Sequence, residues 1–261
     1  MDELRLDRDG AIATVTLNRP ERKNAMTGAM FRGFAELLRD IGADSSIRAL
    51  VVTGAGGEFC AGADVGGGGA ANDGPSKHQL QAMHEINQGA LLLHELPIPT
   101  IARVDGVAVG AGMNMALGCD LIVASDRARF SEIFANIGLS IDYGGSWLLP
   151  RLIGLHKAKE LVFTAEILSA TDAAKLGLVN HVVPVDELDS KVDELAQRLA
   201  AAPTLAVSMS KKLLNASMSS SMSEALNAEA MAQTVTIAGT TDAVEGFTAF
   251  AEKRKPDFQG R

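Results

Sequence analysis

The chain has 261 residues, of which 47% are apolar and 21% charged, so it can bury a large core and is not intrinsically disordered. Its 24 Lys and Arg against 32 Asp and Glu give a net charge of -8, which argues against binding to nucleic acid or an anionic membrane, because both need a cationic face. No secretory signal or membrane-spanning stretch is recognisable. The two cysteines, Cys60 and Cys119, fit no metal spacing. We therefore expect a soluble, cytoplasmic protein.

Strands and helices alternate over the first two thirds of the chain. In residues 11–17 the side chains alternate in character as they do in a half-buried strand, and Pro20 follows the end of this segment. Residues 28–41 carry apolar side chains at helical spacing, and the β-branched run 47–53 is typical of a strand covered on both faces. The further predicted elements are a helix over 80–96 and strands over 100–104, 121–124 and 181–183.

After about Ser169 the pattern changes to consecutive helices. Ser169 and Ser221 each stand three residues before an acid, Asp172 and Glu224, which is the spacing of the capping box that opens a helix. The sequence therefore predicts an α/β core over residues 1–185 and a helical C-terminal region over residues 186–261, which act as one functional unit.

The glycine-rich segments do not match the known phosphate-binding loops. The segments 54–56 and 110–112 both lack the third glycine of a dinucleotide fingerprint, and no Gly-Lys-Ser/Thr follows either one. A Gly-x-Ser-x-Gly elbow is also absent from the sequence, and the spacing of its 5 His indicates no metal site. We expect neither a metal nor a nucleotide cofactor.

Two turns of small residues each follow a predicted buried strand. Residues 61–64 (Ala-Gly-Ala-Asp) form the first turn, and residues 109–113 (Val-Gly-Ala-Gly-Met) form the second and open a helix. Glycine and alanine let a ligand approach the backbone, and a helix N-terminus offers unpaired N–H groups. Two such N–H groups that face one oxygen make an oxyanion hole.

At these residues the chain resembles the enoyl-CoA hydratase/isomerase (crotonase) superfamily. The matching segments follow the family's order over essentially the whole chain: 18–20, 24–25, 61–64, 104–120, 171–179 and 250–255. The resemblance implies an α/β fold, a crotonase-like spiral of ββα units with a helical C-terminal trimerisation region, and a homotrimer or a hexamer of two trimers. It also implies acyl-CoA thioester substrates, with the backbone N–H groups of Ala63 and Ala111 holding the thioester oxygen as an enolate.

The sequence departs from the hydratase pattern at both positions where hydratases carry a catalytic glutamate. Asn114 and Phe134 stand there, and neither an amide nor a phenyl ring exchanges a proton near neutral pH. Asp142, which is followed by Gly-Gly-Ser and an aromatic, resembles the acid of 1,2-epoxyphenylacetyl-CoA isomerases and Δ3,Δ2-enoyl-CoA isomerases. One carboxylate suffices to move a proton between two carbons of a dienolate, and apolar neighbours would raise its pKa toward useful values.

The resemblance further implies the residues that bind CoA, which is part of the substrate and the only cofactor-like group expected. These residues are Arg22, Lys23 and Ala25 at the pantetheine and phosphate segment, Ala61, Asp64 and Val65 at the adenine-binding loop, and Phe250 and Lys253 from a neighbouring subunit. Residues 65–77 and the helix after them would wall the acyl pocket, and the glycines in that segment are typical of a lid. The two cysteines are interpreted as small core residues.

The leading interpretation is a cofactor-independent acyl-CoA isomerase in which Asp142 moves the proton. A hydratase in which Asp142 handles both the water and the proton stays open, as does an acyl-CoA binding protein without turnover. The 4-chlorobenzoyl-CoA dehalogenases use an aspartate at this position as a nucleophile. They are less favoured, because Asn87 stands where their helix histidine is expected, with His84 one turn away.

Overall fold

The computed structural model describes residues 3–66 and 78–261, so most of the predicted lid, residues 67–77, lies outside the described residues. The main sheet has the strand order β1-β2-β3-β4-β6-β9. Only the β1–β2 pair is antiparallel in this sheet. Its strands are β1 (Leu4–Asp9), β2 (Ile12–Leu17), β3 (Ala49–Gly54), β4 (Thr100–Val104), β6 (Leu121–Ser125) and β9 (His181–Val183). This is the α/β sheet that the alternating sequence pattern predicts.

A second, smaller sheet has the order β5-β7-β8, from β5 (Val107–Val109), β7 (Arg129–Ser131) and β8 (Leu168–Ser169). The chain passes from β4 in the large sheet to β5 in the small one, and then from β6 in the large sheet to β7 in the small one. These two turns of the chain each place one strand in each sheet before a helix follows, which is the expected winding of ββα units. The β5–β7 pair leads directly into the first turn of α3 (Ala111–Gly118).

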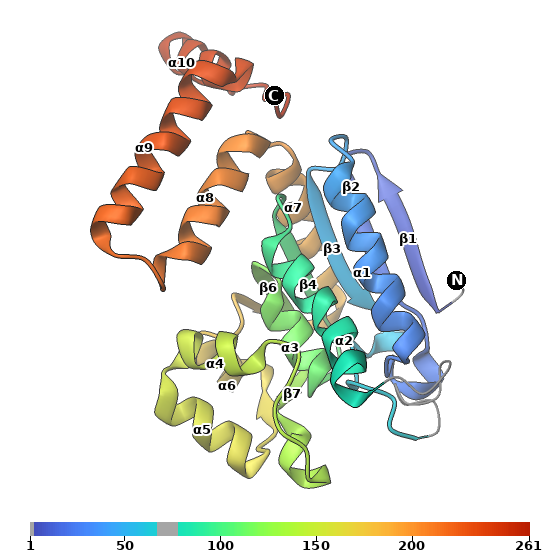
Figure 1. Ribbon diagram of the computed structural model, residues 1–261. Coiled ribbons are helices and arrows are strands. Elements are labelled where there is room, and N and C mark those ends of the chain that lie inside the picture. The colour runs from blue at the N-terminus through green and yellow to red at the C-terminus, as the bar shows by residue number, and fades with distance from the viewer. Residues whose placement is uncertain (1–2, 67–77) are drawn as a thin grey trace.

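Helices cover both faces of the large sheet. On β3, Leu50 and Val52 pack into the main core, and Val51 between them packs against α7 (Leu188–Ala200), because successive side chains of a strand point to opposite faces. The other face is covered by α1 (Gly28–Ala43) and α2 (Gln79–Glu95), which lie side by side (Figure 1). The predicted strand over 47–53 is therefore covered on both faces, as expected. It also follows that the first helix of the predicted C-terminal region belongs to the packing of the sheet.

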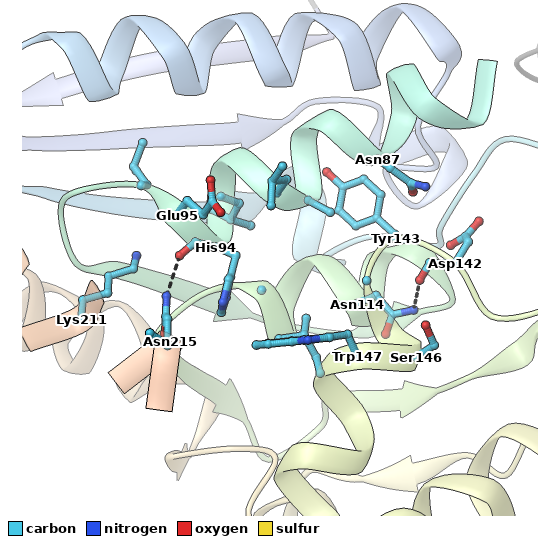
Figure 2. A pocket seen from close by; sticks show the side chains of 18 of the residues that line it. Asn87, His94, Glu95, Asn114, Asp142, Tyr143, Ser146, Trp147, Lys211 and Asn215 are labelled. Atoms are coloured by element: carbon cyan, nitrogen blue, oxygen red, sulfur yellow. Dashed lines mark hydrogen bonds between the residues drawn. The ribbon is translucent and has the colours of Figure 1, made fainter. Parts of the chain in front are cut away.

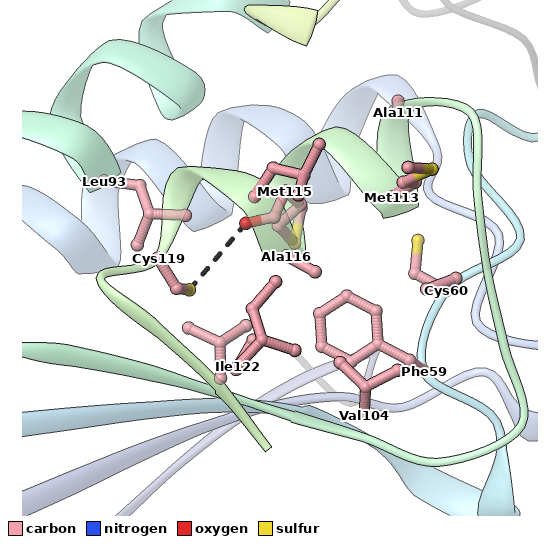
Figure 3. Close-up of a cluster of buried hydrophobic side chains, with 14 of the residues drawn as sticks. Phe59, Cys60, Leu93, Val104, Ala111, Met113, Met115, Ala116, Cys119 and Ile122 are labelled. Carbon is pink, nitrogen blue, oxygen red and sulfur yellow. Dashed lines mark hydrogen bonds between the residues drawn. The ribbon is translucent and has the colours of Figure 1, made fainter. Parts of the chain in front are cut away.

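The short helix α3 lies in the middle of the core, with all 8 of its residues buried. Figure 3 shows Cys60 and Cys119 among the apolar side chains around this helix. Both thiols are free, and burial raises the pKa of each to about 12, so neither forms a reactive thiolate. The interpretation of the cysteines as core residues is confirmed.

The last three helices extend away from the body: α8 (Thr204–Ser217), α9 (Met222–Gly239) and α10 (Thr241–Glu252) (Figure 1). The capping box predicted at Ser221 opens α9, with the side chains of Ser221 and Glu224 each bonded to the other's backbone N–H. These helices expose a series of large apolar side chains: Leu214, Met218, Met222, Leu226, Met231, Val244, Phe247 and Phe250. An exposed apolar surface of this kind is typical of an interface with another protein.

Three further helices stand beside the small sheet, namely α4 (Gly145–Ile153), α5 (Leu155–Thr164) and α6 (Ala170–Lys175). The predicted cap at Ser169 opens α6, where its hydroxyl accepts a hydrogen bond from the Asp172 N–H. Across residues 3–66 and 78–261, none of the helices combines the length and apolar composition needed to cross a membrane.

Candidate active site

The two small-residue turns lie against each other at the start of α3. Cys60 forms a parallel bridge with Ala108 of β5, in which the Cys60 N–H donates to the Val107 carbonyl (2.9 Å) and the Val109 N–H donates to the Cys60 carbonyl (3.0 Å). Gly112 in the first turn of α3 packs directly on this segment, since a Cβ at Gly112 would lie 2.3 Å from the Cys60 carbonyl oxygen. Only glycine allows this close approach of the helix to the strand.

The backbone amides of Ala63 and Ala111 are both available to a ligand. Ala63 bridges Met26 in parallel through its two neighbours: the Met26 N–H donates to the Gly62 carbonyl (2.8 Å) and the Asp64 N–H donates to the Met26 carbonyl (2.9 Å), so the Ala63 N–H points away from Met26. The adjacent Gly62 lies close to Ala111, since a Cβ at Gly62 would be 3.6 Å from the Ala111 nitrogen. Within the part of the chain that the structure describes, neither amide donates a hydrogen bond. Two free N–H groups in neighbouring turns are what an oxyanion hole requires.

The side chain of Asn114, one turn further along α3, holds the loop that carries Asp142. Its amide Nδ2 donates to the carbonyl of Asp142 (3.0 Å) and to Oε2 of Glu132 (3.3 Å). Figure 2 shows the bond to Asp142. The first residue of α4, Gly145, packs on this amide so closely that a Cβ there would lie 2.4 Å from it. Asn114 therefore fixes the position of the Asp142 loop relative to α3.

Asp142 is a half-buried carboxylate without a compensating cation. Its Oδ1 is buried and has no hydrogen-bond partner among the described residues, and no Lys, Arg or His in these residues forms an ion pair with it. Burial raises the pKa of Asp142 to about 6. Its carbonyl also accepts the N–H of Gly145 (2.9 Å), so the residue closes the turn before α4 as well. A carboxylate with a pKa this close to neutrality is suited to taking up and returning a proton.

Asp142 and Asn114 lie at one end of a cavity of about 1290 Å³. Figure 2 shows Lys211 and Asn215 of α8 at the opposite end, where Asn215 donates to the carbonyl of His94 (3.1 Å). Lys211 is paired with Asp120 (2.8 Å). The walls between the two ends come mainly from α2 and α4: Met83, Asn87, Ala90, Leu91, Leu93, His94, Trp147 and Leu148. A cavity with largely apolar walls and a few polar groups fits a small organic acyl group.

Two further side chains lie beside the first turn of α3. Phe134 is buried, and a Cβ at Gly110 would be 3.6 Å from its ring. Glu132 is only 1% exposed and was not among the residues predicted from the sequence. Burial, together with the nearby charge of Asp142, raises the pKa of Glu132 to about 8 against the opposing effect of its bond from Asn114. The sequence carries no signal for its burial, since an acid after Ser131 is expected to be an exposed turn residue.

The two segments predicted to hold CoA, residues 22–25 and 61–65, lie next to each other. The Ala61 N–H donates to the Lys23 carbonyl (2.9 Å), which places residues 22–25 beside residues 61–65. Arg22, Lys23 and Val65 are exposed, and Ala25 is half-buried. The carboxylate of Asp64 is different, because it is buried and accepts hydrogen bonds from the Gly66 N–H and from Arg19 (both 3.0 Å), which lower its pKa. Its carboxylate therefore stabilises the loop.

Phe250 and Lys253 do not join the site within one chain. Figure 1 places α10 at the opposite end of the molecule from the turn at residues 61–65, and the Phe250 side chain is 87% exposed. Any contact of these two residues with CoA therefore needs a neighbouring subunit. Among residues 3–66 and 78–261, no group of three or more His, Cys, Asp and Glu side chains could hold a metal ion.

Comparison with known proteins gives consistent matches over the full length. The sequence profile described as "Enoyl-CoA hydratase/isomerase" matches residues 7–261. The 1,2-epoxyphenylacetyl-CoA isomerase of Escherichia coli (strain K12) is 37% identical over 252 residues, which cover 96% of this chain and 95% of that protein. The crystal structure of enoyl-CoA hydratase from Bacillus anthracis has a TM-score of 0.91 at 32% identity, covering 99% of this chain and 100% of that one. A structure from Thermobifida fusca YX in complex with CoA has a TM-score of 0.84 at 34% identity, covering 91% and 93%.

Proposed function

The chain belongs to the enoyl-CoA hydratase/isomerase family, and on this premise we propose that it is an acyl-CoA isomerase with no cofactor beyond the CoA of its substrate. The observation that carries the proposal is the carboxylate of Asp142, half-buried and unpaired among the described residues at the end of the cavity. The positions at which the hydratase pattern requires glutamates hold Asn114 and Phe134. The similarity to an isomerase over nearly the whole chain gives independent support.

The proposed reaction moves one proton between two carbons of the acyl group. Asp142 removes a proton from the first carbon, and the electrons of that C–H bond pass into a dienolate whose negative charge lies on the thioester oxygen. The N–H groups of Ala63 and Ala111 hold that oxygen, and in enzymes each such donor contributes roughly 3–4 kcal/mol to the stability of the transition state. Asp142 then returns the same proton to a second carbon, so that the double bond shifts and no water is consumed.

The CoA part of the substrate is proposed to lie along residues 22–25 and 61–65, where the exposed cations Arg22 and Lys23 would neutralise phosphate charge. We also propose a homotrimer or a hexamer of two trimers, in which Phe250 and Lys253 of one subunit reach the CoA of another. The exposed apolar surface of α8–α10 supports this assembly, and light scattering of the purified protein tests it. The two free, buried thiols are compatible with the predicted cytoplasmic location.

Hydration is the second candidate reaction, because a structure described as an enoyl-CoA hydratase shares the fold across the whole chain. The two reactions are separated by incubating the protein with crotonyl-CoA and with a 3-enoyl-CoA. We expect a double-bond shift with the second substrate and slow or no addition of water to the first. Fast hydration without a double-bond shift would reject the isomerase. If the wild type turns over neither substrate and Asp142→Asn binds the CoA ester with wild-type affinity, the chain is a binding protein.

A further inference from the structure

The site contains a second buried carboxyl group that the proposed reaction does not use. Four buried polar atoms lack a hydrogen-bond partner among the described residues: Asn114 Oδ1, Glu132 Oε1, Asp142 Oδ1 and the hydroxyl of Tyr143. The first three of these residues are adjacent, because Asn114 donates to Glu132 and to the Asp142 carbonyl. The Tyr143 hydroxyl lies apart from them, beside Gly89 of α2. The unpartnered atoms of Asn114, Glu132 and Asp142 are all acceptors, so this cluster lacks hydrogen-bond donors.

A proton on Glu132 supplies a missing donor at the correct place. A carboxylic acid and a carboxamide pair through two hydrogen bonds, in which the amide N–H donates to one acid oxygen and the acid O–H donates to the amide oxygen. The first bond, from Asn114 Nδ2 to Glu132 Oε2, is present (3.3 Å). The unpartnered atoms of the same two side chains, Glu132 Oε1 and Asn114 Oδ1, are those that the second bond would join. The neutral acid therefore satisfies two buried atoms, whereas the ionised acid satisfies neither.

The charges around Glu132 also favour its neutral form. The loop before α4 presents the acid Asp142, and α3 presents the uncharged Asn114. On α5, which packs on the segment after Glu132, Lys157 pairs with Glu160 (2.8 Å), and His156 and Lys159 are exposed. Within residues 3–66 and 78–261 no cation forms an ion pair with Glu132 or Asp142. Ionising two buried carboxyl groups with no nearby cation costs a large free energy, so one of them stays protonated.

We propose that in the working enzyme Glu132 and Asp142 together carry one negative charge. Asp142 is ionised and acts as the base, and Glu132 keeps its proton and is the positioning residue for Asn114. This inference rests on the proposed isomerase function. Glu132 neither gives nor takes the substrate proton. Its ionisation removes the donor to Asn114, which holds the Asp142 loop, and adds a second negative charge near that of Asp142. Activity is therefore lost when Glu132 loses its proton, and this ionisation sets the alkaline limit of the reaction.

The test is the pH dependence of the double-bond shift with a 3-enoyl-CoA in the wild type, Glu132→Gln and, as an exposed control acid on α1, Glu36→Gln. For the wild type we expect a rate that rises as Asp142 ionises near pH 6 and then falls about tenfold per pH unit above about pH 8. Glutamine cannot ionise and can donate from Nε2 to Asn114. Glu132→Gln should therefore keep the rising limb and lose the falling one, and Glu36→Gln should keep both. A falling limb that is unchanged in Glu132→Gln overturns the inference.

A second measurement keeps the inference testable if Glu132→Gln is inactive. An infrared difference spectrum of the wild type between pH 7 and pH 9 should show the loss of a protonated carboxylic acid band, and this band should be missing in Glu132→Gln. A wild-type spectrum without such a band overturns the inference. The proposed function has its own test. It is wrong if Asp142→Asn retains the wild-type rate, whatever the pH profile of Glu132→Gln.

Discussion

Replacement of Glu132 by glutamine should stabilise the folded protein at neutral pH, although it removes a buried carboxyl group from the site. In the folded chain the pKa of Glu132 is raised from 4.5 to about 8, mainly by burial. In the unfolded chain the carboxyl ionises freely above pH 4.5, whereas in the folded chain it stays protonated until about pH 8. The folded state therefore loses stability as pH rises between these two values, and the loss is complete above pH 8.

The magnitude follows from the interval between the two pKa values. pH 7 lies about 2.5 pH units above the pKa of the carboxyl in the unfolded chain. At 1.36 kcal/mol per unit, ionisation of the unfolded chain lowers the stability of the folded state by about 3 kcal/mol. At pH 5 the same calculation gives less than about 1 kcal/mol. Glutamine does not ionise, so the stability of Glu132→Gln does not fall in this way. The difference in free energy of unfolding between Glu132→Gln and the wild type should therefore be about 2–3 kcal/mol larger at pH 7 than at pH 5.

Urea denaturation of both proteins at pH 5 and pH 7, followed by circular dichroism, measures this difference. The protein concentration is held constant, because assembly of subunits adds to the apparent stability. Glu36→Gln is the control, and its difference from the wild type should not change with pH. A difference between Glu132→Gln and the wild type that stays constant from pH 5 to pH 7 would show that Glu132 is already ionised in the folded chain, and the reasoning about its burial would be wrong.

Three substitutions test the rest of the site. Asp142→Asn should lower kcat by about 10²–10⁴-fold and leave the affinity for the CoA ester within a few-fold, as measured by the double-bond shift and by calorimetric titration; a rate near that of the wild type would exclude Asp142 as the base. Gly112→Ala should displace the segment at Cys60, since the new Cβ would lie 2.3 Å from its carbonyl oxygen, and should lower kcat by about 10²–10³-fold. The matched control Gly239→Ala, where a Cβ meets nothing within 4 Å, should have no such effect. Arg22→Ala should raise KM about 3–10-fold without changing kcat, with a smaller effect at high salt; a change in kcat alone would place Arg22 outside the CoA site.

The elements with a regular pattern could be predicted from the sequence. The apolar residues of α1 recur at helical spacing, and the β-branched run of β3 has the composition of a strand covered on both faces, so each is defined by its own residues. The turns at 61–64 and 109–113 were also recognisable, because small residues in such turns are required by a close backbone approach. In the structure this approach is the packing of Gly112 on Cys60.

Glu132 could not be predicted in this way, because its burial depends on contacts between distant segments. β7 pairs with β5, and the Gly110 N–H donates to the Ser131 carbonyl (2.9 Å), which brings the residue after Ser131 to the start of α3. In the sequence the same acid stands directly after a short strand, where an exposed turn residue is expected. Phe250 and Lys253 are a different case, because their predicted contact with CoA depends on the placement of another subunit.

The hydrogen bonds of Asn114 bear on the choice between isomerisation and hydration. A hydratase must hold and orient a water molecule, and a side-chain amide could do so only with a free donor or acceptor. The amide nitrogen of Asn114 has two hydrogens, and these are directed to the Asp142 carbonyl and to Glu132. Its oxygen is paired as well if Glu132 is protonated, and the ring of Phe134 offers no hydrogen bond to water. Asn114 then has no free N–H donor for a catalytic water, and its hydrogen bonds hold the Asp142 loop in place, which favours a proton shift by one carboxylate.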